Sequence, residues 1–255
     1  MVRTERHGAV LTVTMNRPKV LNVLDEALAD ALLAAFTGLG EDRSIRAVIL
    51  AGAGRSFMAG GDLSRFHADL AAAPGTASFL IDRFHGLMRL IKAMPQPVIA
   101  AVQGPVAGGG VGLALACDLV IAAQDATFLS AYTKLGTNPD GGTTWTLTQL
   151  LGPRRALEFV LLNDVINAED ALRLGLVNSV VPGSELGNAA RALAERLSVG
   201  SFGATKATKE LVRAATTGSF DEQLNLEKQA FVTNAGSDDF REGIAAFFEK
   251  RAARF

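Results

Sequence analysis

The 255-residue chain has almost no cysteine, since Cys117 is the only one. A single cysteine excludes a disulfide within the chain and makes a cysteine-rich metal site impossible. The fold must therefore depend on a packed apolar core, for which 49% hydrophobic residues are sufficient. The length suits one large domain, or one domain with a small appendage.

The chain also lacks an excess of charge and a long apolar run. Its net charge is −1, so nothing indicates a nucleic-acid or anionic-membrane partner, and any anion must be held locally. No apolar run reaches the roughly 18 residues that cross a bilayer, and "MVRTERHGAVLTVTMNRP" lacks a signal-peptide pattern. We expect a soluble cytoplasmic protein.

Several catalytic motifs are missing. There is no GxSxG elbow, P-loop lysine motif or HExxH, and "GGGVGLA" (108–114) lacks the full dinucleotide fingerprint. His7, His67 and His85 lie far apart without metal-ligand spacing. We interpret each as a surface or partly buried histidine and predict no metal site.

The distribution of apolar residues predicts an α/β fold. Strand-like segments alternate with helical patterns over the first part of the chain, which is typical of a layered core with right-handed crossovers. The expected strands are 9–16, 45–54, 97–104 and one or two within 118–131; the expected helices are 22–42, 76–94, 109–116 and 143–150. After residue 153 the patterns are mainly helical, with "LVNSVV" strand-like and a last helix beginning at Ser237. We expect an α/β core over 1–185 and a helical region over 186–255.

Two glycine clusters each follow a predicted strand and precede a helix. They are "SFMAGGDLSRF" (56–66) and "GPVAGGGVGLALACDLVIA" (104–122). Backbone N–H groups are free at such junctions, and two amides that converge on one oxygen form an oxyanion hole. Tight helix packing and turn geometry are the alternative explanation for the same glycines.

These clusters, with "MNRPKVLN" (15–22), "GLVNSVV" (175–181) and "REGIAAFFEKR" (241–251), resemble the crotonase superfamily, the enoyl-CoA hydratase/isomerase family. The resemblance runs almost from end to end. It implies a spiral of ββα turns and a C-terminal helical region that mediates trimerisation, with trimers that often pair into hexamers.

The resemblance also assigns residues to a site for an acyl-CoA thioester. The amides of Gly61 and Gly109 would hold the thioester carbonyl, and no metal or redox cofactor is needed, because CoA is part of the substrate. Further expected substrate or CoA contacts are Lys19, Ala59, Asp62, Leu63, Arg65, Tyr132, Phe247 and Lys250. Of these, Phe247 and Lys250 frequently act from a neighbouring subunit, whereas Lys19 and Arg65 are equally well explained as ordinary surface cations.

The sequence departs from the family's hydratases at both glutamates that those enzymes use, where it has Gly112 and Tyr132. A lost acid–base group commonly costs about 10²–10⁴ in rate, so hydration by the usual mechanism is not expected. "TKLGTNPDGGTTWTL" (133–147) is instead similar to the ring-epoxide and oxepin-forming isomerases of phenylacetyl-CoA breakdown. That similarity implies that Asp140 is the acid/base residue. Pro139-Asp140-Gly141-Gly142 is also good turn chemistry, and an aspartate there could simply shape a turn or cap a helix.

The resulting hypothesis is an isomerase that shifts a double bond or rearranges a ring in an acyl-CoA. The alternatives are a hydratase with atypical residues, a hydrolase or dehalogenase with Asp140 as nucleophile, and a non-catalytic acyl-CoA-binding subunit. We expect the shape of the acyl pocket to depend on a mobile region at 66–85. Within it, "HADLAAAPGTAS" (67–78) has the composition of a loop that orders on ligand binding, or of a surface loop without function.

Overall fold

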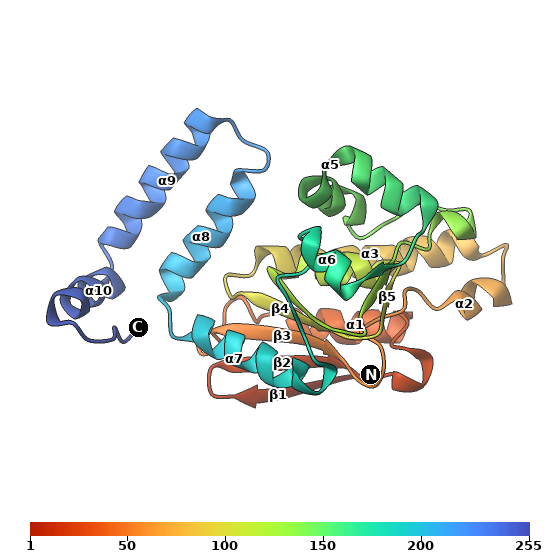
Figure 1. Cartoon of the computed structure of the whole chain (residues 1–255), viewed down its shortest axis with the longest axis horizontal. Helices are drawn as coiled ribbons and strands as arrows, with labels where there is room; N and C mark the ends of the chain where they lie inside the picture. The colour runs from red at the N-terminus through yellow and green to blue at the C-terminus, as the bar shows by residue number, and fades with distance from the viewer.

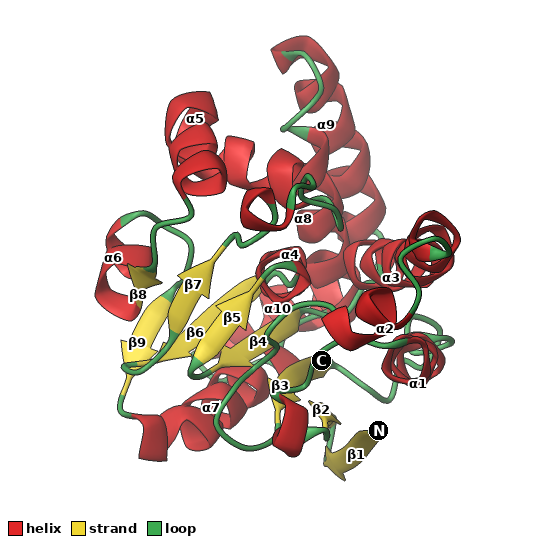
Figure 2. Ribbon diagram, turned by 90° about the vertical axis from the view of Figure 1, so that its right-hand side faces the viewer, coloured by secondary structure: helices red, strands yellow, loops and turns green.

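The computed structural model describes all residues from 1 to 255, and its centre is a twisted six-stranded sheet (Figure 2). β1 pairs antiparallel with β2, and every other neighbouring pair is parallel. The strand order is β1 (Val2–His7), β2 (Val10–Met15), β3 (Ala47–Gly52), β4 (Val98–Val102), β6 (Leu119–Ala123) and β9 (Ser179–Val181). A second, small sheet contains β5 (Pro105–Ala107), β7 (Thr127–Leu129) and β8 (Ile166–Asn167).

The two sheets are built from repeated strand–strand–helix turns. β4 lies in the large sheet, β5 in the small one, and α4 (Gly109–Ala116) follows; β6, β7 and α5 (Thr143–Leu162) repeat this order. An isolated parallel bridge from Met58 to Val106 places the turn that begins with β3 in the same arrangement. The predicted α/β class is therefore confirmed.

Both faces of the large sheet are buried, as expected of parallel strands. On one face, α1 (Glu26–Phe36) and α3 (Ala73–Ala93) join the main core with Val48 and Leu50 of β3. On the other face, α7 (Leu186–Ser198) packs Ala190 and Ala194 against Ile49 of the same strand. Hence α7 packs on the sheet, although it lies beyond residue 185; the division into 1–185 and 186–255 stays a prediction.

The last three helices stand apart from the sheet (Figure 1). They are α8 (Phe202–Ala214), α9 (Phe220–Ala235) and α10 (Asp238–Glu249). Ser237 accepts the backbone N–H of Phe240 and caps α10, so the predicted start of the last helix is confirmed. Phe247 and Phe248 on α10 are 76% and 77% exposed, which leaves an apolar face without a partner in the single chain.

The region expected to be a mobile loop is mostly helical, which corrects the prediction for 66–85. α2 covers Leu63–Ala68 and α3 begins at Ala73, so only 69–72 lie outside helices. Pro74 lies in the first turn of α3, where proline is tolerated, and the alanines around it favour helix.

The remaining elements are short. β1 was not predicted, because its alternate residues are exposed and charged. α5 contains a break at Gly152 before Pro153. The others are α6 (Ala168–Arg173) and the 3₁₀ turns Pro18–Val20, Thr133–Leu135 and Gly183–Glu185. No helix combines the length and apolar character needed to cross a membrane.

Candidate active site

The two glycine clusters meet in the structure. The Ala107 N–H donates to the Met58 carbonyl at 3.0 Å, beside the bridge that joins the two segments. A Cβ atom at Gly108 would lie 3.4 Å from the Gly60 Cα, and Gly108 has φ +52°. The close approach of the two backbones and this left-handed φ both require glycine.

The amides of Gly61 and Gly109 have no hydrogen-bond partner. The neighbours of Gly61 pair with Leu24, whose N–H donates to the Gly60 carbonyl at 2.8 Å, while the Gly61 N–H remains free. Gly109 is the first residue of α4, where backbone amides lack an acceptor within the helix. A Cβ at Gly61 would meet nothing within 4 Å. Two free amides on touching loops are an arrangement that can stabilise an oxyanion.

Asp140 lies in a tight turn and does not cap the helix that follows. Gly141 and Gly142 have φ +60° and +74°, and the Thr143 N–H donates to the Asp140 carbonyl at 3.0 Å. The expected turn is confirmed. Gly142 is the N-cap of α5 and no side chain caps it, so the helix-cap alternative is wrong. The Asp140 carboxylate is partly buried.

Tyr132 connects Asp140 with the glycine loops. Its hydroxyl donates to Asp140 Oδ1 at 2.5 Å, and its Cζ lies 4.0 Å from the position of a Cβ on Gly108. Burial, followed by the nearby Asp140 charge, raises the pKa of Tyr132, so the phenol stays protonated at neutral pH. Sequence reasoning placed Tyr132 in the site but did not foresee this hydrogen bond.

The positions of the two family glutamates hold no carboxylate, and Thr143 fills the space at the first. A Cβ at Gly112 would lie 2.5 Å from Thr143 Oγ1 and 3.7 Å from the Asp140 carbonyl oxygen. Thr143 is buried, and its hydroxyl has no hydrogen-bond partner. Asp140 therefore supplies the carboxylate in this part of the molecule.

The side chains that flank Gly61 serve the local structure. The Asp62 carboxylate accepts the Ser64 N–H at 3.2 Å and lies 3.7 Å from the Arg17 guanidinium. Arg17 also pairs with Asp25 at 2.9 Å, which joins the "MNRPKVLN" segment to the start of α1. Ala59 is partly buried and Leu63 is exposed. The Asp62 side chain therefore has partners within the protein that the sequence prediction did not include.

The predicted basic residues do not gather at one place. Arg65 pairs with Glu26 at 2.9 Å, which raises the pKa of its guanidinium, whereas Lys19 is exposed without an ion pair. Phe247 and Lys250 are both exposed at the end of α10, which stands on the opposite side from α2 in Figure 1. Within one chain, the structure does not bring these two residues to the glycine loops.

His85 contacts the Asp140 turn, which sequence reasoning missed. Its Nε2 accepts the Gly141 N–H at 3.1 Å, although 56 residues separate the two in the chain. No motif or spacing links them, because the contact arises only when α3 packs beside the turn. The interpretation of His85 as a histidine remote from the site is therefore wrong.

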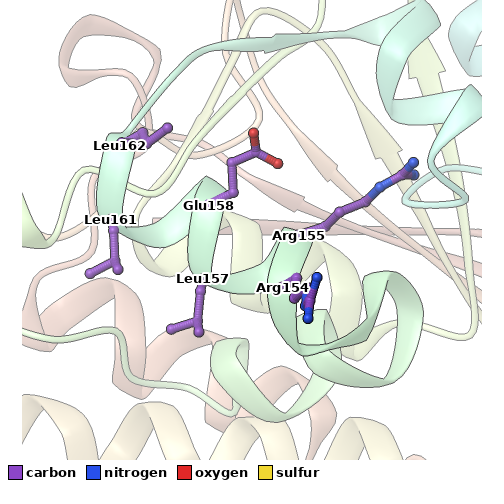
Figure 3. Close-up of a pocket in the computed structure, with 6 residues that line it drawn as sticks. All are labelled: Arg154, Arg155, Leu157, Glu158, Leu161 and Leu162. Atoms are coloured by element: carbon purple, nitrogen blue, oxygen red, sulfur yellow. The ribbon is translucent and has the colours of Figure 1, made fainter.

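Two surface pockets are prominent. One, of about 420 Å³, lies on α5 and is drawn in Figure 3; its lining comes from that helix alone and includes no predicted site residue: Arg154, Arg155, Leu157, Glu158, Leu161 and Leu162. The other, of about 540 Å³, adjoins the Asp140 turn through His85, Gly141 and Gly142. No three His, Cys, Asp or Glu side chains come together in a way that could hold a metal ion.

Comparison with known proteins identifies the family. The family described as "Enoyl-CoA hydratase/isomerase" matches residues 5–255. The chain is 37% identical over 247 residues to 1,2-epoxyphenylacetyl-CoA isomerase of Escherichia coli, covering 96% of this chain and 94% of that protein. It is 38% identical over 257 residues to a probable enoyl-CoA hydratase of Rhodobacter capsulatus, covering 100% and 97%.

Solved structures agree with this result. An enoyl-CoA hydratase from Polaromonas sp. superposes with a TM-score of 0.95 at 35% identity, over 99% of this chain and 98% of that chain. An enoyl-CoA hydratase from Bacillus anthracis gives 0.95 at 33% identity, over 100% and 98%. The chain belongs to the enoyl-CoA hydratase/isomerase family and has the crotonase fold.

Proposed function

We propose that this protein is an isomerase of enoyl-CoA thioesters, with Asp140 as its single acid/base residue. The observation that carries the proposal is the Asp140 carboxylate, which Tyr132 holds beside the loops with the free Gly61 and Gly109 amides. A relative at 37% identity is an acyl-CoA isomerase, which supports the same reaction class.

In the proposed reaction, the Gly61 and Gly109 N–H groups bind the thioester carbonyl oxygen. They bind the enolate more strongly than the carbonyl, because the negative charge develops on that oxygen, and each such donor is typically worth about 3–4 kcal/mol. Asp140 removes a proton from C2 of a 3-enoyl thioester, so the C2–H bond breaks and a dienolate forms. The protonated Asp140 then donates the proton to C4, and the double bond moves from C3–C4 to C2–C3.

One carboxylate is sufficient for this reaction, because the same proton leaves one carbon and returns to another. Tyr132 binds Oδ1 of Asp140, and the other carboxylate oxygen has no hydrogen-bond partner in the protein. The free oxygen is available as the base, while the tyrosine fixes the orientation of the group. Syn-hydration by the usual route needs a second carboxylate, for which Gly112 and Tyr132 provide no substitute.

The C-terminal helices support a second part of the proposal, which concerns assembly. Phe247 and Phe248 leave an apolar face on α10 exposed, and Lys250 follows it. We propose that these residues contact the CoA of a neighbouring subunit in a homotrimer or a dimer of trimers. Such an assembly would cover the apolar face and bring Lys250 to a site that it does not reach within its own chain.

An ultraviolet assay tests the proposed reaction. Wild type and Asp140→Asn are compared on 3-enoyl-CoA and 2-enoyl-CoA, since conjugation with the thioester raises the absorbance and hydration removes it. The proposal predicts that wild type moves the double bond and that the variant loses about two or more decades in kcat. Loss of absorbance from 2-enoyl-CoA would identify a hydratase, and a covalent acyl- or aryl-enzyme at Asp140 would identify a nucleophile.

A further inference from the structure

The 540 Å³ pocket behind the Asp140 turn is not used by the proposed mechanism. It lies between the second half of α3, the start of α5 and the end of α8, and Ala116 at the end of α4 also contributes. Its lining is largely polar and basic: His85, Met88, Arg89, Lys92, Ala116, Gly141, Gly142, Trp145, Thr146, Arg213, Thr216 and Thr217.

The charge in this pocket is of one sign. Arg89, Lys92 and Arg213 line it, no Asp or Glu does, and none of the three cations forms an ion pair. The nearby Asp118 is already engaged, because it pairs with Lys209 at 2.5 Å and accepts the Val98 N–H at 2.8 Å. Burial lowers the pKa of Lys92, as expected of an ammonium without a partner.

Neutral donors point to the same kind of ligand. The hydroxyl residues Thr146, Thr216 and Thr217 line the pocket, and so does the start of α5 at Gly142 and Trp145. The backbone N–H groups of Gly142 and Trp145 have no acceptor in the protein. Three cations, hydroxyls and free helix amides together suit a carboxylate, because it accepts several hydrogen bonds at once.

The pocket lies at a defined place relative to the free amides. Near the start of α4, Phe84 contacts the Gly109 position, where a Cβ would be 3.4 Å from its ring; near the end, Lys92 Nζ lies 3.4 Å from the Leu115 carbonyl oxygen. α3 thus runs along α4 from the amides to the basic pocket. At 1.5 Å per residue this path is roughly 10 Å long, which is the length of a medium acyl chain.

We propose that this pocket binds a carboxylate, and that the carboxylate is the far end of the substrate's acyl chain. The substrate class is then the mono-CoA thioester of an unsaturated dicarboxylic acid. The acyl chain would pass Asp140 and the edge of Phe84, which separates Gly109 from Gly141. The carboxylate site stands on the pocket itself, whereas the choice of the acyl chain as its source rests on the proposed function.

Trp145 allows a test that needs no turnover, because it is the only tryptophan and lines the pocket. Its fluorescence is titrated with saturated acyl-CoA thioesters of equal chain length that end in a carboxylate or in a methyl group. The proposal predicts at least about ten-fold tighter binding of the carboxylate-ended thioester, and loss of most of this preference in Arg89→Gln and in Arg213→Gln. Arg191→Gln on α7, which is exposed and unpaired, is the matched control and should preserve the preference.

Equal binding of the two thioesters by wild type, or a preference that both arginine variants keep, overturns the proposal. Adipate and glutarate, added as free acids, separate the two sources of the carboxylate. If these acids quench Trp145 while the thioesters bind equally, the acyl chain is rejected as the source. Saturated thioesters cannot isomerise, so these outcomes are independent of the Asp140→Asn assay that tests the proposed reaction.

Discussion

The Tyr132 hydroxyl donates a hydrogen bond to Oδ1 of Asp140 at 2.5 Å, although Tyr132 stands where the family's hydratases have a glutamate. The residue that replaces one carboxylate thus holds another. This bond leaves the second oxygen of Asp140 without a partner and directs the carboxylate from a turn that two left-handed glycines shape. A replaced acid–base residue has become a positioning residue.

Tyr132→Phe should lower kcat by about 10- to 100-fold with little change in KM. The variant removes a hydrogen bond to a charged group, which is worth about 1.5–3 kcal/mol, but it leaves the ring and the free amides in place. Steady-state kinetics on the enoyl-CoA that wild type converts measures the effect. Thr144→Val, an exposed change on the first turn of α5, is the control and should leave kcat intact. A higher KM at constant kcat would show that Tyr132 binds substrate and does not position Asp140.

Gly112→Glu, which restores the family's first glutamate, should destabilise the protein by about 1–3 kcal/mol. Its Cβ would lie 2.5 Å from Thr143 Oγ1, which must move. Adding Thr143→Ala should recover at least about 0.5 kcal/mol relative to the sum of the single variants, because it opens the space that the glutamate needs. Urea unfolding of the four proteins in this double-mutant cycle measures the coupling. Additive single effects would show that the two positions do not compete.

Gly61→Ala and Gly104→Ala should separate function from stability. A Cβ at Gly61 meets nothing within 4 Å, so the alanine variant should fold within about 1 kcal/mol of wild type. It should lose kcat/KM, since the methyl group enters the open space at the free amide. Gly104 has φ +53°, and a Cβ there would lie 1.9 Å from the Arg55 carbonyl oxygen, so Gly104→Ala should cost more than about 4 kcal/mol. Full activity of a folded Gly61→Ala variant would place the substrate elsewhere.

Glu242 should titrate well below its usual range. Hydrogen bonds from Arg251 and from the Arg254 N–H lower the pKa of Glu242 to about 2. Because the pKa is lower in the folded state, the contact stabilises the end of the chain fully above the unfolded pKa near 4.5 and is lost as the pH falls toward 2. Carboxyl-detected NMR measures this titration. In Arg251→Gln the pKa should rise, and an unchanged value would mean that Arg251 is not the cause.

Much of the fold could be predicted from the sequence, because its signals are local. The apolar run of β4 and the serine that caps α10 each identify their element, and the glycine-rich junctions mark the loops at Gly61 and Gly109. β1 escaped because its exposed residues resemble those of a loop, and it forms a strand only by pairing with β2. The Ala-rich stretch that begins α3 was misjudged as a loop, because its composition suits either state.

The predicted site depended on resemblance for its roles and on the fold for its contacts. Asp140 and Tyr132 are eight residues apart, and nothing in that spacing shows that the hydroxyl reaches the carboxylate. The contact of His85 with Gly141 spans 56 residues, so only the packing of α3 beside the turn reveals it. The same packing brings Arg89 and Lys92 together with Arg213, which no motif connects.

Mass spectrometry of the product formed in H₂¹⁸O tests most directly whether Asp140 moves a proton without adding water. Wild type is incubated with 3-enoyl-CoA, and the product is measured before and after Asp140→Asn. The account predicts 2-enoyl-CoA of unchanged mass without ¹⁸O, formed by wild type and nearly absent with the variant. A product that has gained one molecule of ¹⁸O-labelled water, or equal turnover by the variant, would contradict it.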